Sequence, residues 1–365
     1  CSTIIWNQRQ PFSKINKKDI RLQTKEALQD FFVSHGAPSF KGGQVYQWLW
    51  QKGAHDFDLM TNLSLEHRNI LKSYFEIKHI NIAAQQCSSD GTIKNAVKLY
   101  DQLVVESVLI PTASRTTACV SSQVGCSLDC VFCATAALKR MRNLNADEIY
   151  DQVVAIDQQS KLYHSRPLSN IVFMGMGEPL MNYKNVIAAI DKITHPEGLA
   201  MSPKRITLST SGIPKMIRKM ADDNVKFRLA VSLHSARQEV REKIMPFAKK
   251  FDLKDLVDSL VYWNEYSKKQ ITFEYIVWEG INDQKEDIQA LVALCKRIPS
   301  KVNIIQYNAI DGSLMKQAQQ SVIDDYIATL TRARVKVTYR RSRGLDIDAA
   351  CGQLANKLDI KGALT

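Results

Sequence analysis

Three cysteines near the middle of the chain have a spacing that suits a metal centre. Within the stretch ACVSSQVGCSLDCVFC, Cys126, Cys130 and Cys133 follow the pattern CxxxCxxC, so one loop could supply three thiolates. A zinc ion would want a fourth ligand, and no His or Cys stands at a matching spacing nearby. A 4Fe-4S cluster held by three thiolates leaves one iron open for a substrate. The pattern therefore favours an iron-sulfur cluster, with zinc as the alternative.

Eight cysteines could in principle pair as disulfides. A tight cluster in a cytosolic chain of this size instead favours metal binding or catalysis. We interpret Cys87 and Cys295 as small buried hydrophobic residues, and Cys351 taken alone would be interpreted in the same way. The chain begins at Cys1, and we expect this to be a trimmed or partial N-terminus.

Polar residues follow several strand-like runs, where active sites of parallel (β/α) scaffolds are built. Glu178 stands beside glycines in MGMGEP, and its carboxylate could accept a cationic group of a ligand. Ser209, the triplet from Ser232 to His234, and Asn308 each end another run. Any one of them could be an ordinary strand-end cap or turn. Their repeated position after successive strands favours a shared site.

The elements that must position these residues alternate between β-branched apolar runs and amphipathic helical patterns. The strand-like runs cover 118–124, 170–175, 205–210, 226–233, 271–277, 301–307 and 335–340. The helical patterns between them cover 145–159, 185–193, 213–223, 252–266, 284–298 and 322–334. This alternation predicts parallel βαβ units, hence an α/β fold with an open doubly wound sheet or a full or partial barrel.

The first part of the chain has a different pattern. Short-looped helical segments run from about Asp19 to Phe75, and alternating runs with an Asp90-Gly91 turn follow between Ile80 and Pro111. We therefore expect four parts. They are an N-terminal helical domain over 1–78, a β-rich connection over 79–111, the barrel over 112–350, and a C-terminal segment over 351–365.

A formal net charge of +12 favours a polyanionic partner, although a basic surface alone could explain it. The charge is concentrated in 138–143 and 332–344, close to the cysteines, which favours nucleic acid; YRRSRG at 339–344 would then contact phosphates. No uncharged apolar run reaches eighteen residues, and no secretion signal is visible. We expect a cytoplasmic protein with no membrane partner.

Five stretches of the sequence together closely resemble the RlmN family. Members of this family are radical S-adenosylmethionine (SAM) enzymes that methylate carbon 2 of adenine in 23S rRNA and tRNA. The stretches are CVSSQVGCSLDCVFCAT, NIVFMGMGEPL, RITLSTSG, SLH and RSRGLDIDAACGQLA. The resemblance runs from about Phe40 to Lys357. It implies a partial (β/α)6 radical SAM barrel behind a small helical RNA-contacting domain. It also implies a 4Fe-4S cluster and two SAM molecules per turnover, with 23S rRNA and tRNA as partners. An electron donor such as flavodoxin or ferredoxin is expected, and so is a monomer.

The resemblance assigns roles residue by residue. Cys126, Cys130 and Cys133 match the cluster ligands. The matching cofactor contacts are Gly177, Glu178, Ser209, Ser232, Leu233, His234 and Asn308. The sequence departs from the family in 134–144, which lacks the usual glycines, and at Ala309, where proline is usual.

The implied reaction gives roles to two further cysteines. Carbon 2 of adenine is electron-poor, so it cannot attack the cofactor's methyl group directly. In the family a cysteine is methylated first, and that methyl group then becomes a radical that adds to the base; Cys351 matches this carrier. Cys119 matches the thiol that resolves the covalent adduct through a disulfide, and Glu106 matches the proton acceptor.

Two other functions stay open at this point. A related family methylates carbon 8 of the same rRNA adenine and confers antibiotic resistance, and motifs separate the two families poorly. A non-catalytic iron-sulfur RNA sensor would give Cys351, Cys119 and Glu106 no chemical role.

Overall fold

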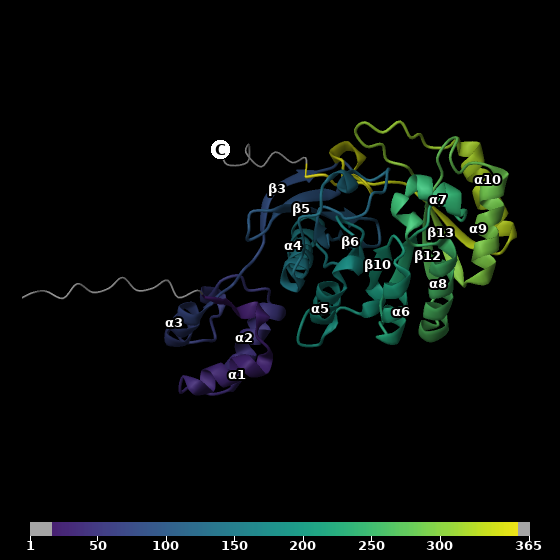
Figure 1. Cartoon of the computed structure of the whole chain (residues 1–365). Helices are drawn as coiled ribbons and strands as arrows, with labels where there is room; N and C mark the ends of the chain where they lie inside the picture. Colours follow the sequence, from purple (N-terminus) through teal and green to yellow (C-terminus); the bar gives the residue numbers. More distant parts are fainter. Residues whose placement is uncertain (1–16, 357–365) are drawn as a thin grey trace, which may run out of the picture. The chain divides into compact units, whose positions relative to one another are not determined.

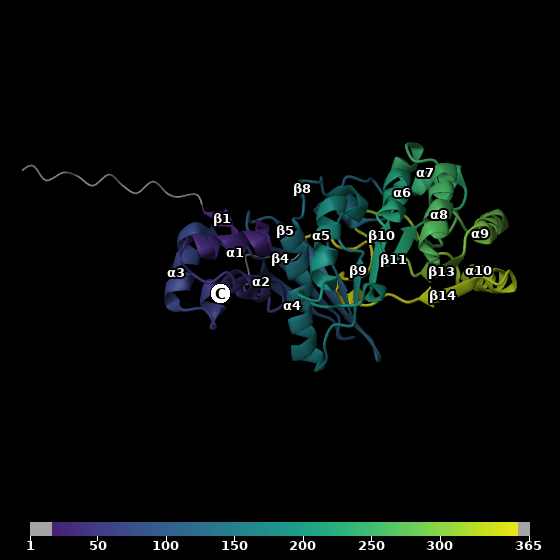
Figure 2. The same cartoon turned by 90° about the horizontal axis from the view of Figure 1, so that it is seen from below.

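The computed structural model describes residues 17–356 (Figures 1 and 2). This part of the chain falls into two compact units, one ending at His79 and one beginning at Ile80. We call them the N-terminal unit (17–79) and the core unit (80–356).

The N-terminal unit contains the helices expected between Asp19 and Phe75. Its elements are β1 (Lys18–Asp19), η1 (Ile20–Leu22), α1 (Lys25–Ser34), α2 (Phe40–Trp50), η2 (Phe57–Leu59), α3 (Leu65–Tyr74) and β2 (Phe75–Glu76). The Thr24 and Ser64 side chains cap α1 and α3 by accepting hydrogen bonds from backbone N–H groups of the first turn. Gly42 lets α2 approach α1 closely, since a Cβ there would lie 2.3 Å from the backbone nitrogen of Gln29.

One sheet of ten strands organises the core unit. Its order is β14-β13-β12-β11-β10-β9-β6-β5-β4-β3, so β14 and β3 are its edges and the barrel is open. The parallel part consists of β6 (Thr116–Cys119), β9 (Asn170–Phe173), β10 (Ile206–Thr210), β11 (Arg228–Ser232), β12 (Ile271–Ile276), β13 (Ser300–Ile305) and β14 (Lys336–Arg340). Each of the seven predicted runs contributes one of these strands, which confirms the predicted alternation.

The β-rich stretch before the barrel extends the same sheet. Strands β3 (Asn81–Cys87), β4 (Ile93–Lys98) and β5 (Val104–Pro111) are antiparallel, and β5 pairs with β6. A separate two-stranded ladder joins β7 (Gln123–Val124) and β8 (Arg142–Asn143). Residues 80–111 therefore continue the barrel sheet.

Helices connect the consecutive parallel strands. They are α4 (Ala146–His164), α5 (Tyr183–Thr194), α6 (Pro214–Asp222), α7 (Gln238–Ile244), α8 (Leu253–Ser267), α9 (Lys285–Arg297) and α10 (Gln320–Arg332). Short 3-10 turns are η3 (Ala134–Ala137), η4 (Pro179–Asn182), η5 (Pro203–Arg205), η6 (Pro246–Lys249) and η7 (Leu345–Ile347). Helices α4, α5, α6 and α8 follow one another along the sheet (Figures 1 and 2).

The central strands are buried, as expected for a parallel sheet. All six residues of β12 are buried, including the polar Thr272 and Glu274. Because the parallel strands share one direction, their carboxyl ends meet at one edge. Polar residues at these ends are therefore brought together.

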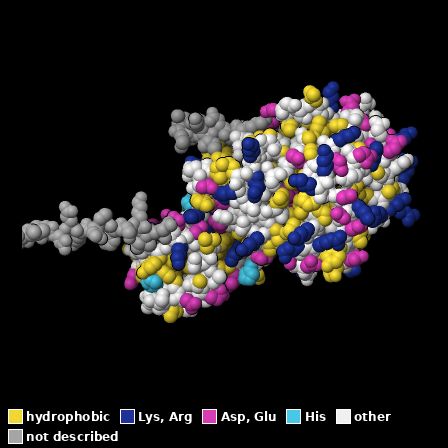
Figure 3. Space-filling model, in the orientation of Figure 1, with side chains coloured by type: hydrophobic (Ala, Val, Ile, Leu, Met, Phe, Trp, Pro, Cys, Tyr) yellow, Lys and Arg dark blue, Asp and Glu magenta, His cyan; other side chains and the backbone are white. Residues whose placement is uncertain are grey.

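The charges on the visible surface do not mark a single binding face for a partner. Figure 3 shows Lys and Arg side chains spread over the visible face of the core unit, with Asp and Glu among them. Among the helices of residues 17–356, none is long and apolar enough to cross a membrane.

Candidate active site

A pocket lies where the parallel strands end, and residues from distant parts of the sequence line it. The predicted site residues among its lining are Cys126, Cys130, Cys133, Gly177, Glu178, Ser209, Ser232, His234, Asn308 and Cys351. The predicted residues that do not line it are Leu233, Cys119 and Glu106. The structure therefore gathers the expected cluster ligands, most of the expected cofactor contacts and the expected methyl carrier around one cavity.

The three cysteines of the CxxxCxxC loop face this cavity as neighbours. The backbone N–H of Leu128 donates to Cys126 Sγ at 3.4 Å, and the N–H of Cys133 donates to the carbonyl oxygen of Cys130 at 3.2 Å. Burial raises the pKa of all three thiols, that of Cys126 to about 11, and the pKa of Cys130 is raised further by Cys133 and Cys126. Thiolates clustered in this way need a cation to stabilise them.

These thiols fit the three protein ligands of an iron-sulfur cluster. They are free thiols in the structure, with no disulfide among the described cysteines. Within residues 17–356 there is no group of three or more His, Cys, Asp or Glu side chains already gathered for a single metal ion. The cluster loop instead offers its three sulfurs to the open cavity, where a larger centre could be held.

Glu178 is held rigidly at the start of η4. Its carboxylate accepts hydrogen bonds from the N–H of Leu180 at 3.0 Å, the hydroxyl of Thr210 at 2.7 Å and the N–H of Ser211 at 2.7 Å. Burial raises its pKa, while these donors oppose the shift. A buried carboxylate fixed in this way suits a cationic ligand group, as expected for the cofactor's ammonium.

Gly177 shapes the approach to Glu178. Its φ is +94°, and a Cβ there would lie 2.5 Å from the Cβ of Gln123. The side-chain oxygen of Gln123 accepts the N–H of Glu178 at 2.9 Å. Only glycine therefore fits between the cluster-loop strand β7 and the carboxylate.

His234 follows β11 and places a buried ring in the pocket wall. Its Nδ1 accepts the N–H of Ile276 at 3.2 Å, and its ring centroid lies 4.7 Å from that of Phe132, which stands next to Cys133. Burial lowers the pKa of His234 to about 3, helped by the positive charge of Arg241, so the ring is neutral. Leu233 instead is fully buried in the core, and its N–H donates to the carbonyl oxygen of Glu274.

Two buried oxygens in the pocket lining have no hydrogen-bond partner among the described residues. They are Oδ1 of Asn308 and Oε2 of Glu274. A buried acceptor without a donor is costly, and a bound molecule with N–H or O–H groups would satisfy it. Both atoms therefore fit a cofactor that carries an amine and hydroxyl groups, as SAM does.

Backbone carbonyl groups of the segment that carries Cys351 accept hydrogen bonds from Asn308 and from the loop after the three cysteines. The Asn308 amide donates to the Cys351 carbonyl oxygen at 3.1 Å, and the N–H of Ala134 donates to the carbonyl oxygen of Gly352 at 2.7 Å. The Thr135 hydroxyl donates to the carbonyl oxygen of Leu354, also at 2.7 Å. The glycine-poor loop after the cluster therefore binds the segment that carries Cys351.

Cys119 lies at the buried end of β6, close to Cys351. Burial raises the pKa of Cys119 to about 12; the neighbouring Cys351 adds to this shift and Arg340 opposes it. Arg340 interacts most strongly with Cys351, and this interaction raises the pKa of the guanidinium. The Arg340 guanidinium therefore lies close to both sulfurs.

Glu106 is buried on β5, behind the segment that follows Cys351. Its Oε2 accepts the N–H groups of Ala355 at 2.8 Å and Asn356 at 3.1 Å. A glutamate on an isolated strand would normally face solvent, so this burial is a distinct feature of the structure.

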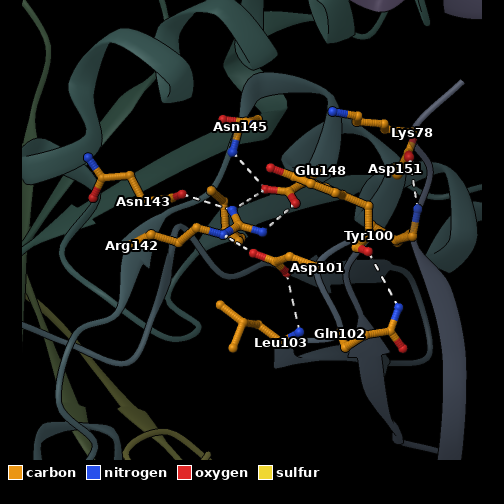
Figure 4. A network of polar contacts seen from close by, with 12 residues as sticks. Lys78, Tyr100, Asp101, Gln102, Leu103, Arg142, Asn143, Asn145, Glu148 and Asp151 are labelled. Atoms are coloured by element: carbon orange, nitrogen blue, oxygen red, sulfur yellow. Dashed lines mark hydrogen bonds and ion pairs between the residues drawn. The ribbon is translucent and has the colours of Figure 1, made fainter. Parts of the chain in front are cut away.

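A network of ion pairs anchors the far end of the cluster loop (Figure 4). The Arg142 guanidinium binds both oxygens of Glu148 at 2.7 and 2.8 Å, and its Nε donates to Asp101 Oδ2 at 2.6 Å. Glu148 also accepts the N–H of Asn145 at 2.8 Å, at the start of α4. Arg142, in the basic run 138–143, therefore holds β8 to α4 and to the β4–β5 turn and is not a free phosphate ligand.

Sequence reasoning missed several residues that support the site. Gln123, Thr210 and Ser211 position the Gly177–Glu178 turn, but isolated polar residues in such runs carry no distinctive signal. The prediction that Cys87 is buried is wrong: β3 is an edge strand, and Cys87 is exposed at its end. Cys295 is buried, as predicted.

Comparison with known proteins shows the class to which this chain belongs. The Radical SAM superfamily model matches residues 120–292, and the model described as ribosomal RNA large subunit methyltransferase N-terminal domain matches 19–77. The crystal structure of a radical SAM methyltransferase from Sphaerobacter thermophilus superimposes with a TM-score of 0.87 at 32% identity, covering 92% of this chain and 99% of that one. The predicted radical SAM barrel is thereby confirmed, and fold and site together define a SAM-dependent RNA methyltransferase with an iron-sulfur cluster.

The relatives narrow the class. A probable dual-specificity RNA methyltransferase RlmN of Christiangramia forsetii is 67% identical over 94% of this chain and 98% of its own length. The dual-specificity RNA methyltransferase RlmN of Geotalea uraniireducens is 42% identical over 94% of this chain and 98% of its own length. The chain belongs to the RlmN family of dual-specificity RNA methyltransferases, as its motifs predicted.

Proposed function

We propose that this enzyme methylates carbon 2 of adenine in two kinds of RNA. In 23S rRNA the target is one adenine at the peptidyl transferase centre, and in tRNAs it is the adenine next to the anticodon. Two SAM molecules would be used per turnover, one as methyl donor and one as radical source. The enzyme would act in the cytoplasm as a monomer, with flavodoxin or ferredoxin as electron donor.

One observation carries the proposal: Cys351 and the three cysteines of the cluster loop line the same pocket. A non-catalytic sensor would have no use for a fourth thiol beside its cluster. A methyl-carrying cysteine, by contrast, must reach both the cofactor and the base.

Different residues of the pocket would bind the cluster and the cofactor. Cys126, Cys130 and Cys133 would hold the cluster, and Glu178 and Asn308 would orient the cofactor through its amine groups. When bound, cluster and cofactor supply the electron and the 5′-deoxyadenosyl radical that takes a hydrogen atom from the methylated Cys351. The apolar ring of Phe132 and the neutral ring of His234 line the cavity without offering a charge that would attract water.

The two thiols outside the cluster would act in turn. The Cys351 sulfur would take the first methyl group by displacement, beside the Arg340 guanidinium. After the methylene carbon has bonded to the base, the Cys119 sulfur would bond to the Cys351 sulfur as the bond from Cys351 to that carbon breaks. The carbon would then gain a proton to become the methyl group, and the unpaired electron left by the radical addition would pass to the bound cluster. Glu106 accepts the proton that leaves carbon 2.

Nucleoside mass spectrometry tests the proposal. Unmodified 23S rRNA and tRNA are incubated anaerobically with reconstituted enzyme, SAM and reductant, and the RNA is then digested. We expect 2-methyladenosine from both RNAs. The appearance of 8-methyladenosine would instead identify the carbon-8 reaction, and no methylated adenine with an intact cluster would overturn the proposal in favour of a sensor.

A further inference from the structure

A buried ion pair lies beneath the segment that carries Cys351. Lys94 on β4 and Glu106 on β5 have side chains only 3% and 1% exposed, and Lys94 Nζ lies 3.8 Å from Glu106 Oε1. In the β4–β5 ladder Ala96 stands opposite Glu106, so Lys94 and Glu106 are diagonal neighbours on one face of the sheet. A buried ion pair by itself adds little to stability, because desolvating the two charges is costly. The other hydrogen bonds of Lys94 and Glu106 indicate the role of this pair.

The two partners of this ion pair hold opposite ends of one segment. Lys94 Nζ donates to the carbonyl oxygen of Asp348 at 3.5 Å, three residues before Cys351. Glu106 Oε2 accepts the N–H groups of Ala355 and Asn356, which follow Cys351. Segment 348–356 is therefore fastened to the sheet on both sides of the reactive thiol.

In this arrangement the carboxylate oxygens of Glu106 are already engaged by other groups of the protein. Its Oε2 is used by two backbone donors, while its Oε1 has no hydrogen-bond partner among the described residues apart from the Lys94 charge. Leu354, directly before these donors, lines the pocket, whereas Glu106 does not. A base in the pocket cannot reach this carboxylate while Ala355 and Asn356 cover it.

We propose that Lys94 and Glu106 form a clamp on segment 348–356, with Lys94 as a positioning residue, and that RNA binding releases Ala355 and Asn356 to expose Glu106. The second half rests on the proposed function, in which Glu106 accepts the carbon-2 proton. In that step the carbon–hydrogen bond breaks, its electron pair stays in the ring, and the proton moves to the freed Glu106 oxygen.

Amide hydrogen exchange read by mass spectrometry tests the clamp in the full-length, RNA-free protein. In the peptide over 345–356 we expect Lys94→Met and Glu106→Leu to raise the exchange rate roughly tenfold to a hundredfold, the effect of losing hydrogen bonds to a charged group. Lys336→Met is the matched control, since Lys336 is an exposed strand lysine on β14, and it should leave this rate unchanged. Unchanged exchange in both clamp variants would overturn the clamp.

A double variant guards against misfolding. Lys94→Met alone leaves the Glu106 charge buried without a partner, which could unfold the protein. Lys94→Met combined with Glu106→Leu leaves no buried charge, and it should show the same fast exchange over 345–356 and wild-type exchange in β9 and β10.

The release is tested with wild-type holoenzyme and unmodified tRNA. RNA binding should raise the exchange of Ala355 and Asn356, whereas a purely structural ion pair predicts equal or slower exchange and would contradict the release. Neither exchange measurement requires methylation. Fast exchange in the variants together with no 2-methyladenosine from wild type would support the clamp while refuting the proposed function.

Discussion

The side-chain amide of Asn308 donates a hydrogen bond to the backbone carbonyl oxygen of Cys351 at 3.1 Å, while its own oxygen faces the pocket without a partner. Asn308 follows β13, and Cys351 lies beyond β14 in the C-terminal segment. One side chain thus connects the pocket to Cys351, the proposed methyl carrier. The position of Cys351 is therefore coupled to whatever occupies the pocket.

Replacing Cys119 should trap the reaction halfway. In Cys119→Ala the methyl carbon still bonds to the base, but no second sulfur is available to release it from Cys351. We expect a protein–RNA species that persists in denaturing gels. Cys295→Ala, which removes another buried free thiol outside the pocket, should give none. Equal release of free product by Cys119→Ala would refute the resolving role.

Gly177→Ala should impair cofactor binding and stability together. The left-handed φ costs about 1 to 2 kcal/mol for alanine, and the clash with Gln123 adds about 1 to 3 kcal/mol. Gly280→Ala is the matched control, because Gly280 also has a positive φ but no atom within 4 Å of its Cβ position. Denaturant unfolding and SAM titration of both variants check this. Similar losses in the two variants would show that the contact with Gln123 is unimportant.

His234 should make stability fall in mild acid. Its pKa is about 3 in the folded chain, against 6.5 as the ordinary value. Below pH 6.5 the unfolded chain therefore gains a proton that the folded chain does not, and stability falls until the pH reaches about 3. Between pH 7.5 and 5 this contributes a loss of about 2 kcal/mol.

Urea unfolding of cluster-free protein at these two pH values measures that contribution. His234→Asn should lose about 2 kcal/mol less than wild type on acidification, because asparagine does not titrate. His195→Asn changes an exposed histidine outside the site and should behave like wild type. The same pH dependence in His234→Asn and wild type would contradict a neutral buried ring.

Local patterns were enough to predict the barrel and the cluster loop. Strand periodicity predicted each parallel strand. The cysteine spacing was enough to propose Cys126, Cys130 and Cys133 as cluster ligands, because all three belong to one loop. The meeting of Cys351 with that loop could not be derived in this way, because it depends on the closure of the whole sheet; only the family resemblance suggested it.

Other features were hidden because their local pattern suggested something else. Lys94 occupies an alternating strand and would be expected to face solvent, yet the C-terminal segment covers it. Asp90 and Gly91 correctly predicted a turn, but not that β3 to β5 extend the barrel sheet. These features depend on contacts between segments far apart in the chain, which no local period encodes.

The most direct test of the central claim follows the methyl group itself. Reconstituted enzyme is incubated with SAM labelled in its methyl group, without reductant, and its peptides are analysed by mass spectrometry. The label should appear on Cys351 and not on Cys119, and it should move to 2-methyladenosine once RNA, unlabelled SAM and reductant are added. Cys351→Ala should form no product, while Cys295→Ala should match wild type. Label on another residue, or methylated adenine from Cys351→Ala, would contradict the claim that Cys351 carries the methyl group.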